Sequence, residues 1–152
     1  MGSSHYLVFT LEGQHYALGL EAIERVVRAV ELTSVPEAPE ILVGLINIRG
    51  KIVPVLDIRR RFHLPPRDME IRDRIIVSRT SSRTIAIIAD TIEGVAEFAQ
   101  EETHEARKIL PDMEGYVEGV GKLNDDTVLI YDINKLFSIN EIRELNIDDP
   151  LD

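Results

Sequence analysis

The chain has 152 residues, 44% of them hydrophobic, which suffices for one packed domain or two small units with a shared core. No apolar run approaches the ~18 residues of a membrane-spanning helix, and no basic region followed by an apolar stretch marks a secretory signal, so we expect no direct membrane insertion. The absence of cysteine excludes disulfides and thiolate metal sites, and a formal net charge of −10 disfavours nucleic acid as a partner.

The first expected elements are strands at residues 6–11 and 15–20, which flank a turn that contains Gly13. A short helix over residues 21–28 is expected next. Its apolar residues fall on one face, and two of its glutamates precede arginines by four residues, the favoured order for helical ion pairs.

Strands at 42–48 and 52–58 follow, on either side of a turn at residues 49–51. Pro54 lies inside the second of these strands and has no amide hydrogen to donate, which predicts an edge strand or a bulge instead of a central strand. The three arginines at 59–61 are interpreted as a solvated helix face and not as a phosphate-binding site.

An internal repeat organises the whole chain. A shift of 69 positions aligns residues 16–27 with 85–96, and a shift of 75 aligns residues 53–58 with 128–133. Both blocks match mostly apolar residues with apolar residues, and each contains acids at matched positions, Glu21 with Asp90 and Asp57 with Asp132. The change of shift indicates about six extra residues in the second copy, between positions 100 and 114.

The second copy repeats the local signals of the first, with strands expected at 75–79 and 84–89. We assign one unit to residues 6–66 and the other to 72–137, with strand exchange between them left open, and an acidic tail to 138–152. Strands this short and closely spaced favour small barrels or a sandwich over a parallel α/β sheet.

No catalytic motif emerges. Asp57 and Asp132 occupy matched positions and form the only candidate carboxylate pair, for acid–base hydrolysis. Each precedes an Ile-x-x-x-Phe stretch, where aspartate commonly caps a helical turn, and capping is the favoured interpretation. The four histidines lack helical metal-ligand spacing, and the acids at 101–105 are interpreted as solvated. We therefore predict no enzyme, metal or cofactor.

Apolar residues recur at i,i+3 spacing in the connecting segments, as Ile23 and Val26 in one copy and Ile92 and Val95 in the other. They belong to a core, pack the two copies together, or line a groove for a partner, and the pattern alone leaves these alternatives open. An oligonucleotide-binding barrel is disfavoured, because the chain is acidic and only 5% aromatic.

The stretch at 43–59, VGLINIRGKIVPVLDIR, closely resembles the signature of the CheW family, the bacterial and archaeal chemotaxis coupling proteins. Residues 6–11 and 87–90 resemble further blocks of that family, so the similarity extends over about residues 6–137. It implies two pseudo-symmetric, five-stranded SH3-like β-barrels in a mainly β protein. It also implies a cytoplasmic adaptor, recruited to membrane receptor arrays, that couples chemoreceptor tips to the CheA histidine kinase, with a non-flagellar array such as a pilus-based one as the alternative.

The same resemblance implies a groove for the receptor's helical hairpin. Arg25 departs from the family, in which many members carry a glutamate that is thought to pair with the arginine matched by Arg49. Two arginines cannot pair in this way, so we expect Glu21 to hold Arg25, and Asp57, a carbonyl or a receptor acid to hold Arg49. The implied partner-binding residues are Ile23, Arg25, Val26, Gly44, Arg49, Ile92 and Val95.

Overall fold

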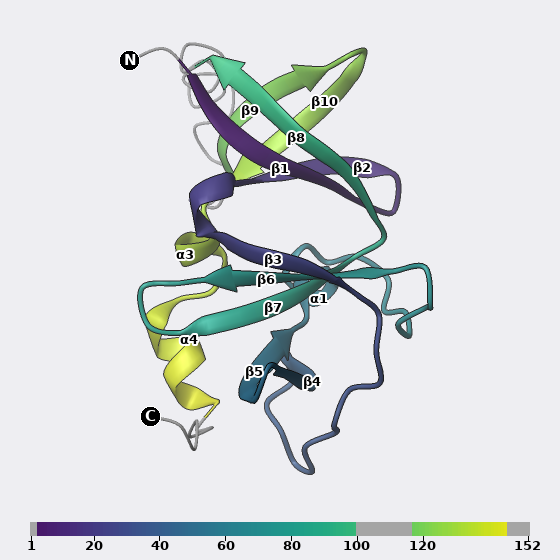
Figure 1. The fold of residues 1–152 in the computed structure, drawn as a ribbon, viewed down its shortest axis with the longest axis vertical. Helices are drawn as coiled ribbons and strands as arrows, with labels where there is room; N and C mark the ends of the chain where they lie inside the picture. Colours follow the sequence, from purple (N-terminus) through teal and green to yellow (C-terminus); the bar gives the residue numbers. More distant parts are fainter. Residues whose placement is uncertain (1–2, 100–116, 146–152) are drawn as a thin grey trace.

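The computed structural model describes residues 3–99 and 117–145, which form two five-stranded sheets drawn one above the other in Figure 1. The upper sheet consists, in spatial order, of β8 (Thr91–Ala99), β1 (Ser3–Leu11), β2 (Gln14–Gly19), β10 (Asp126–Tyr131) and β9 (Val117–Leu123). Within it β10 runs parallel to β2, and all other neighbours are antiparallel.

The lower sheet consists, in spatial order, of β3 (Ile23–Arg28), β6 (Arg74–Arg79), β7 (Thr84–Ala89), β5 (Lys51–Leu56) and β4 (Leu42–Ile48). Here β5 runs parallel to β7, and the other pairs are antiparallel. Both sheets are therefore mixed. The parallel pair occupies the same place in the strand order of each sheet, β2 with β10 in one and β7 with β5 in the other.

The two sheets repeat one design down to the register of their strands. In the parallel pair of the upper sheet Ile130 lies opposite Ala17, and in the lower sheet Val55 lies opposite Ala86. The shifts of 75 and 69 residues found in the sequence relate these pairs to each other. The prediction of two pseudo-symmetric five-stranded units in a mainly β protein is thus confirmed.

Each sheet combines strands from both halves of the chain. The upper sheet takes β1 and β2 from the first half and β8, β9 and β10 from the second, and the lower sheet takes the remaining five. The chain passes between the sheets through the 3₁₀ helix η1 (Leu20–Ala22) after β2, and at Asp90 between β7 and β8. A complete sheet therefore needs strands from both halves.

The helix expected over residues 21–28 is wrong, because this segment forms η1 and then β3. Ile23, Val26 and Val27 are β-branched and suit an extended strand. Val26 pairs with the fully buried Ile76 of β6, and burial along β3 alternates as in a half-buried strand. Pairing with β6 outweighs the weak helical preference of the segment. Because the segment is extended, the i,i+4 ion pairs expected for a helix do not form.

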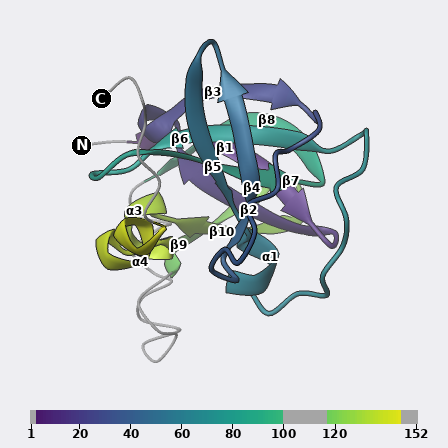
Figure 2. The same ribbon diagram turned by 90° about the horizontal axis from the view of Figure 1, so that it is seen from below.

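Short helices follow the last strand of each copy, and aspartates begin them. Asp57 accepts a hydrogen bond from the Arg60 amide at 3.1 Å and caps α1 (Ile58–Arg61). Asp132 accepts one from the Asn134 amide at 2.9 Å and caps α3 (Ile133–Leu136). The capping interpretation is confirmed for both. A capped helix α4 (Ile139–Glu144) continues from α3, and the two lie together, apart from α1 (Figure 2).

Pro54 lies in β5, the second strand from the edge of its sheet, so the expected edge position is wrong. Pro54 faces Leu45 of β4, whereas the ladder to β7 contains only Val55 and Leu56. The ladder on the β7 side therefore begins one residue after Pro54. A proline is tolerated at this point because the pairing that would need its missing amide hydrogen has not begun.

Aromatic rings pack against one another in and beside the main core. The rings of Tyr16 and Phe62 stack with centroids 4.7 Å apart, and Phe62 lies 4.9 Å from Tyr131. Tyr16 and Tyr131 belong to the upper sheet, Phe62 follows α1, and the same core contains buried Ile87 of the lower sheet. One apolar core thus joins the two units.

The capping aspartates give a first prediction. Asp132→Ala is expected to lower the free energy of unfolding by ~1 kcal/mol, because the first turn of α3 loses a hydrogen-bond acceptor. Asp132→Asn retains a capping oxygen and is expected to stay within ~0.5 kcal/mol of the native chain. Urea denaturation measures both, and equal losses in the two variants would contradict the capping role.

Candidate functional site

Strands β3 and β8 form equivalent edges of the two sheets and carry the four apolar residues whose role the sequence left open. Ile23 on β3 and Ile92 on β8 are partly buried and pack against the main core. Val26 and Val95 remain exposed, with 37% and 56% of their surface accessible. Two of these residues therefore hold the strands to the core, and two are available for contact with a partner.

Each of these edge strands has a β-bulge at the same place, at Glu24 on β3 and at Glu93 on β8. Arg79 of β6 donates to the Glu24 carboxylate at 2.9 Å, and the His15 ring lies 3.2 Å from Glu93. Partial burial acts against ionisation of Glu24, but hydrogen bonds from Arg79 and Thr84 hold its pKa below the usual value. Both bulges thus fix a carboxylate beside the exposed valines.

Arg25 follows the bulge of β3, and its counterpart on β8 is Gly94, whose φ of 120° favours glycine. Arg25 pairs with Val77 of β6 in the strand register and is half-buried. Within residues 3–99 and 117–145, no ion pair joins Arg25 to Glu21, so the expected partner is wrong. Glu21 lies in η1 and Arg25 in the extended β3, so the chain between them rises by more than the single turn that would bring i and i+4 side chains together in an α-helix.

Gly44 and Arg49 lie on β4 and in the turn that follows it. Gly44 is buried, and a Cβ atom there would lie 2.9 Å from the Thr33 carbonyl oxygen, so only glycine permits the bridge between Thr33 and Leu45. Arg49 has a φ of 51° and is exposed in a tight hairpin turn with Gly50. Among the described residues no ion pair links Arg49 to Asp57, whose carboxylate caps α1.

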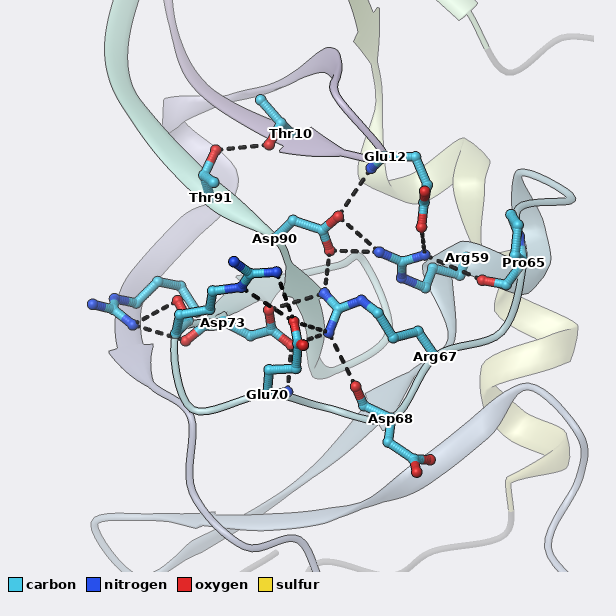
Figure 3. Close-up of polar contacts among 12 residues, drawn as sticks. Thr10, Glu12, Arg59, Pro65, Arg67, Asp68, Glu70, Asp73, Asp90 and Thr91 are labelled. Carbon is cyan, nitrogen blue, oxygen red and sulfur yellow. Dashed lines mark hydrogen bonds and ion pairs between the residues drawn. The ribbon is translucent and has the colours of Figure 1, made fainter.

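Arg59 was expected on a solvated helix face, but it is buried at the junction of the two units (Figure 3). Its guanidinium donates to both carboxylate oxygens of Asp90 at 2.7 Å and also binds Glu12. The solvated-face prediction is wrong for Arg59, because the capped turn of α1 directs it toward the passage between β7 and β8. Arg60 is exposed, with Glu40 3.1 Å away.

Arg67 extends this ionic cluster, which we define as Glu12, Arg59, Arg67, Asp73 and Asp90. Arg67 donates to Asp90 at 2.6 Å and to the fully buried Asp73 at 2.9 Å. Partial burial acts to raise the pKa of Asp90, but the Glu12 amide and both guanidinium groups outweigh it and hold that pKa below its usual value. The two guanidinium groups therefore favour the ionised form of Asp90.

Sequence reasoning missed the ionic cluster, although one signal pointed to it. The repeat aligns Asp90 with Glu21, so an acid stands at both places where the chain passes between the sheets. The partners of Asp90 lie 23 and 31 residues away, on segments that carry no periodic pattern of their own. Only the fold brings them together.

The family model described as the CheW-like domain matches residues 5–141. The chain belongs to the CheW family. The chemotaxis protein CheW of Treponema pallidum is 25% identical over 144 residues, which cover 91% of this chain and 85% of that relative. The CheW of Bacillus subtilis is 26% identical over 129 residues, covering 84% and 83%. The crystal structure of the scaffolding protein TtCheW from Thermoanaerobacter tengcongensis matches with a TM-score of 0.78 at 29% identity, covering 93% of this chain and 96% of that one.

CheW-family proteins are non-enzymatic scaffold adaptors of chemotaxis signalling, so the prediction of an adaptor instead of an enzyme is confirmed. The hydrolase alternative fails at its proposed residues too, since Asp57 and Asp132 each cap a different helix. None of the described helices is long and apolar enough to cross a bilayer. The acids at 101–105 and the extra residues of the second copy lie outside the described residues.

The ionic cluster predicts how stability depends on pH. Because the pKa of Asp90 is lowered by folding, its contribution is present above the unfolded value of ~3.9 and is lost as pH falls through the folded value. Asp90→Asn is expected to reduce the free energy of unfolding by ~2 kcal/mol at pH 7 and to flatten its acid dependence.

Asp68→Asn is the matched control, since Asp68 is exposed on the loop that carries Arg67. Its stability is expected to follow the native chain from pH 7 to pH 3. Urea denaturation at several pH values makes the comparison, and a native acid profile in Asp90→Asn would show that other groups control the acid response.

Proposed function

We propose that this chain couples the cytoplasmic tips of methyl-accepting chemoreceptors to the regulatory domain of a CheA-type histidine kinase. In this role it works in the cytoplasm and is recruited to receptor arrays at the membrane. The observation that carries the proposal is the pair of exposed valines, Val26 and Val95, on equivalent edge strands of a CheW-family chain.

A helical receptor tip suits these strands as a ligand. A helix that binds in a groove needs a few apolar anchors and a rim of orienting polar groups. Val26 and Val95 supply exposed apolar surface, and Ile23 and Ile92 hold the strands beneath it against the core. The bulges add the carboxylate of Glu24 close by, already bonded within the chain and therefore fixed in direction.

Gly44 and Arg49 support the same surface in different ways. Gly44 allows the segment at Thr33 to lie directly against β4, so a larger residue there would displace the backbone of Thr33 and Leu45. Arg49 extends from a rigid two-residue turn, with the Gly50 amide donating to Asn47 at 2.8 Å. We assign Gly44 a shaping role and Arg49 a contact with an acid of the receptor.

A second candidate is an adaptor for a non-flagellar array, such as one that controls pili, and Arg25 favours it. The family resemblance leads us to expect a glutamate at this position, and this chain has an arginine there. A receptor that matches Arg25 carries an acidic residue opposite it. The choice of array therefore depends on charge complementarity at Arg25.

The valines give a direct test. Val26→Asp and Val95→Asp are each expected to weaken binding to a receptor tip by at least tenfold, because a carboxylate is then forced against an apolar helix face. Val30→Asp is the control, since Val30 is 47% exposed but lies after the end of β3. Isothermal titration calorimetry measures the three affinities, and equal loss in the control variant would refute a specific groove.

Arg25 gives a second test. Arg25→Glu is expected to weaken binding to the cognate receptor tip about tenfold through repulsion of its acids, and Arg28→Glu, at the end of the same strand, to change it less than threefold. Arg49→Ala provides the comparison. Unchanged binding in Arg25→Glu together with complete loss in Arg49→Ala would remove Arg25 from the receptor contact.

Co-purification separates the two partners. The native chain is expected to retain both the kinase regulatory domain and a receptor tip from the same organism. Retention of the kinase domain by Val26→Asp, with loss of the receptor tip, supports separate surfaces for them. Binding of the native chain to neither partner would overturn the proposed function.

A further inference from the structure

A cavity of about 560 Å³ lies beside α3, where the first strand of the chain, β9 and the turn between β6 and β7 come together. Its wall includes the acids Glu21 and Glu118, the capping acid Asp132, and the tyrosines Tyr6 and Tyr131. The side chain of Asn134 on α3 completes the wall.

This cavity has a counterpart in the other unit, of about 290 Å³, beside α1. The shift of 75 residues relates Arg59 of the smaller cavity to Asn134 of the larger one, and Val43 to Glu118. Both cavities thus lie at the same place in the repeated fold, beside the capped helix. Their difference in volume follows from what the chain puts into them.

At the smaller cavity, two guanidinium groups of the chain itself line the wall, those of Arg59 and Arg67. Arg59 and Arg67 both bond to Asp90, the acid at the passage between sheets. The repeat matches Asp90 with Glu21, which lines the larger cavity together with Asn134. The chain continues from α3 directly into α4, so no residue of this described segment takes the part of Arg67.

The carboxylates of the larger cavity are not neutralised by the described part of the chain. Among those residues, neither Glu21 nor Glu118 forms an ion pair. The oxygen of Asn134 accepts from the Ser81 amide at 2.7 Å, and the guanidinium of Arg79, on the cavity wall, is bonded to Glu24 instead. At the smaller cavity the chain thus supplies its own cations, Arg59 and Arg67. At the larger cavity Glu21 and Glu118 have no ion-pair partner among the described residues.

The groups around the cavity determine which cation fits it. Burial, then the negative charge of Glu118 and of Glu21, raises the pKa of the Tyr6 hydroxyl, so both acids act at one point of the cavity. Tyr131 lies there too, and burial raises its pKa to about 12. Carboxylates that share one cavity suit a flat guanidinium, which binds carboxylates with two parallel hydrogen bonds.

We propose that the larger cavity binds an arginine side chain of a partner protein, much as Asp90 and Asp73 bind the chain's own Arg67 beside the smaller cavity. A metal ion is a poorer occupant, because the described residues hold no group of three His, Asp or Glu side chains that could coordinate one. The occupant is thus a basic segment of a partner, and the assignment does not require that partner to be a kinase or a receptor.

A pair of small probes tests the cavity in the native chain. Amide-resolved NMR titration with N-acetyl-arginine amide is expected to give saturable shifts at Glu21, Glu118 and Asn134, with millimolar affinity. N-acetyl-citrulline amide has the same shape without the charge, and is expected to bind at least tenfold more weakly. Equal responses to both probes, or shifts spread over the whole surface, would overturn the proposal.

Variants locate the binding in the cavity. Glu21→Gln with Glu118→Gln is expected to weaken the arginine probe at least tenfold, whereas Glu37→Gln, an exposed acid of the segment after β3, is expected to leave it unchanged. Asn134→Arg places the arginine of the first unit in the second and is expected to block the probe from within. Native affinity in the Glu21/Glu118 double variant, with a native amide spectrum elsewhere, would also overturn the proposal.

Discussion

The ion pairs of Asp90 hold the point at which the chain passes from one sheet to the other. Because both sheets take strands from both halves of the chain, the relative position of the units depends on such passages. Buried charges at this passage destabilise the fold unless each one is bonded to an opposite charge. Arg59 is bonded to Asp90, and Arg67 to the fully buried Asp73. The edge strands β3 and β8 are therefore fixed to a frame whose geometry is set by charge as well as by the shared apolar core.

The two copies have the same backbone fold and differ in the side chains available to neutralise their acids. Strand order and parallel register are the same in both units, and both helices after the last strand begin at an aspartate. The side chains that follow differ, since Arg59 of the first copy corresponds to Asn134 of the second. The smaller cavity is thereby lined by Arg59 and Arg67 of the chain itself, and the larger cavity is lined by Glu21 and Glu118. Duplication of a fold allows such a division, because one copy can maintain the frame while the other changes its surface.

How much of this could be predicted from the sequence depends on the range of the interactions involved. Strand pairs and the caps at Asp57 and Asp132 are signalled by neighbouring residues, and these predictions are confirmed. The segment at 21–28 was misread, since pairing with β6, about 50 residues later, decides its conformation. The burial of Arg59 was missed for the same reason, because it depends on an acid 31 residues away. The family resemblance supplied the barrel architecture that periodicity alone left undecided between barrel and sandwich.

The edges of the two sheets favour one kind of partner over another. An exposed, regular edge strand readily pairs with a strand of a second chain, and bulges and charges on the edge prevent this. β3 and β8 have both devices, with a bulge at Glu24 and at Glu93 and further charge at Arg28. Strand addition is thereby discouraged, while Val26 and Val95 stay exposed on the same strands. A ligand whose own backbone hydrogen bonds are already satisfied can use such apolar surface without a regular edge, and a helix meets that requirement. The bulges that protect the adaptor from self-association are in this way consistent with recognition of a helical receptor tip.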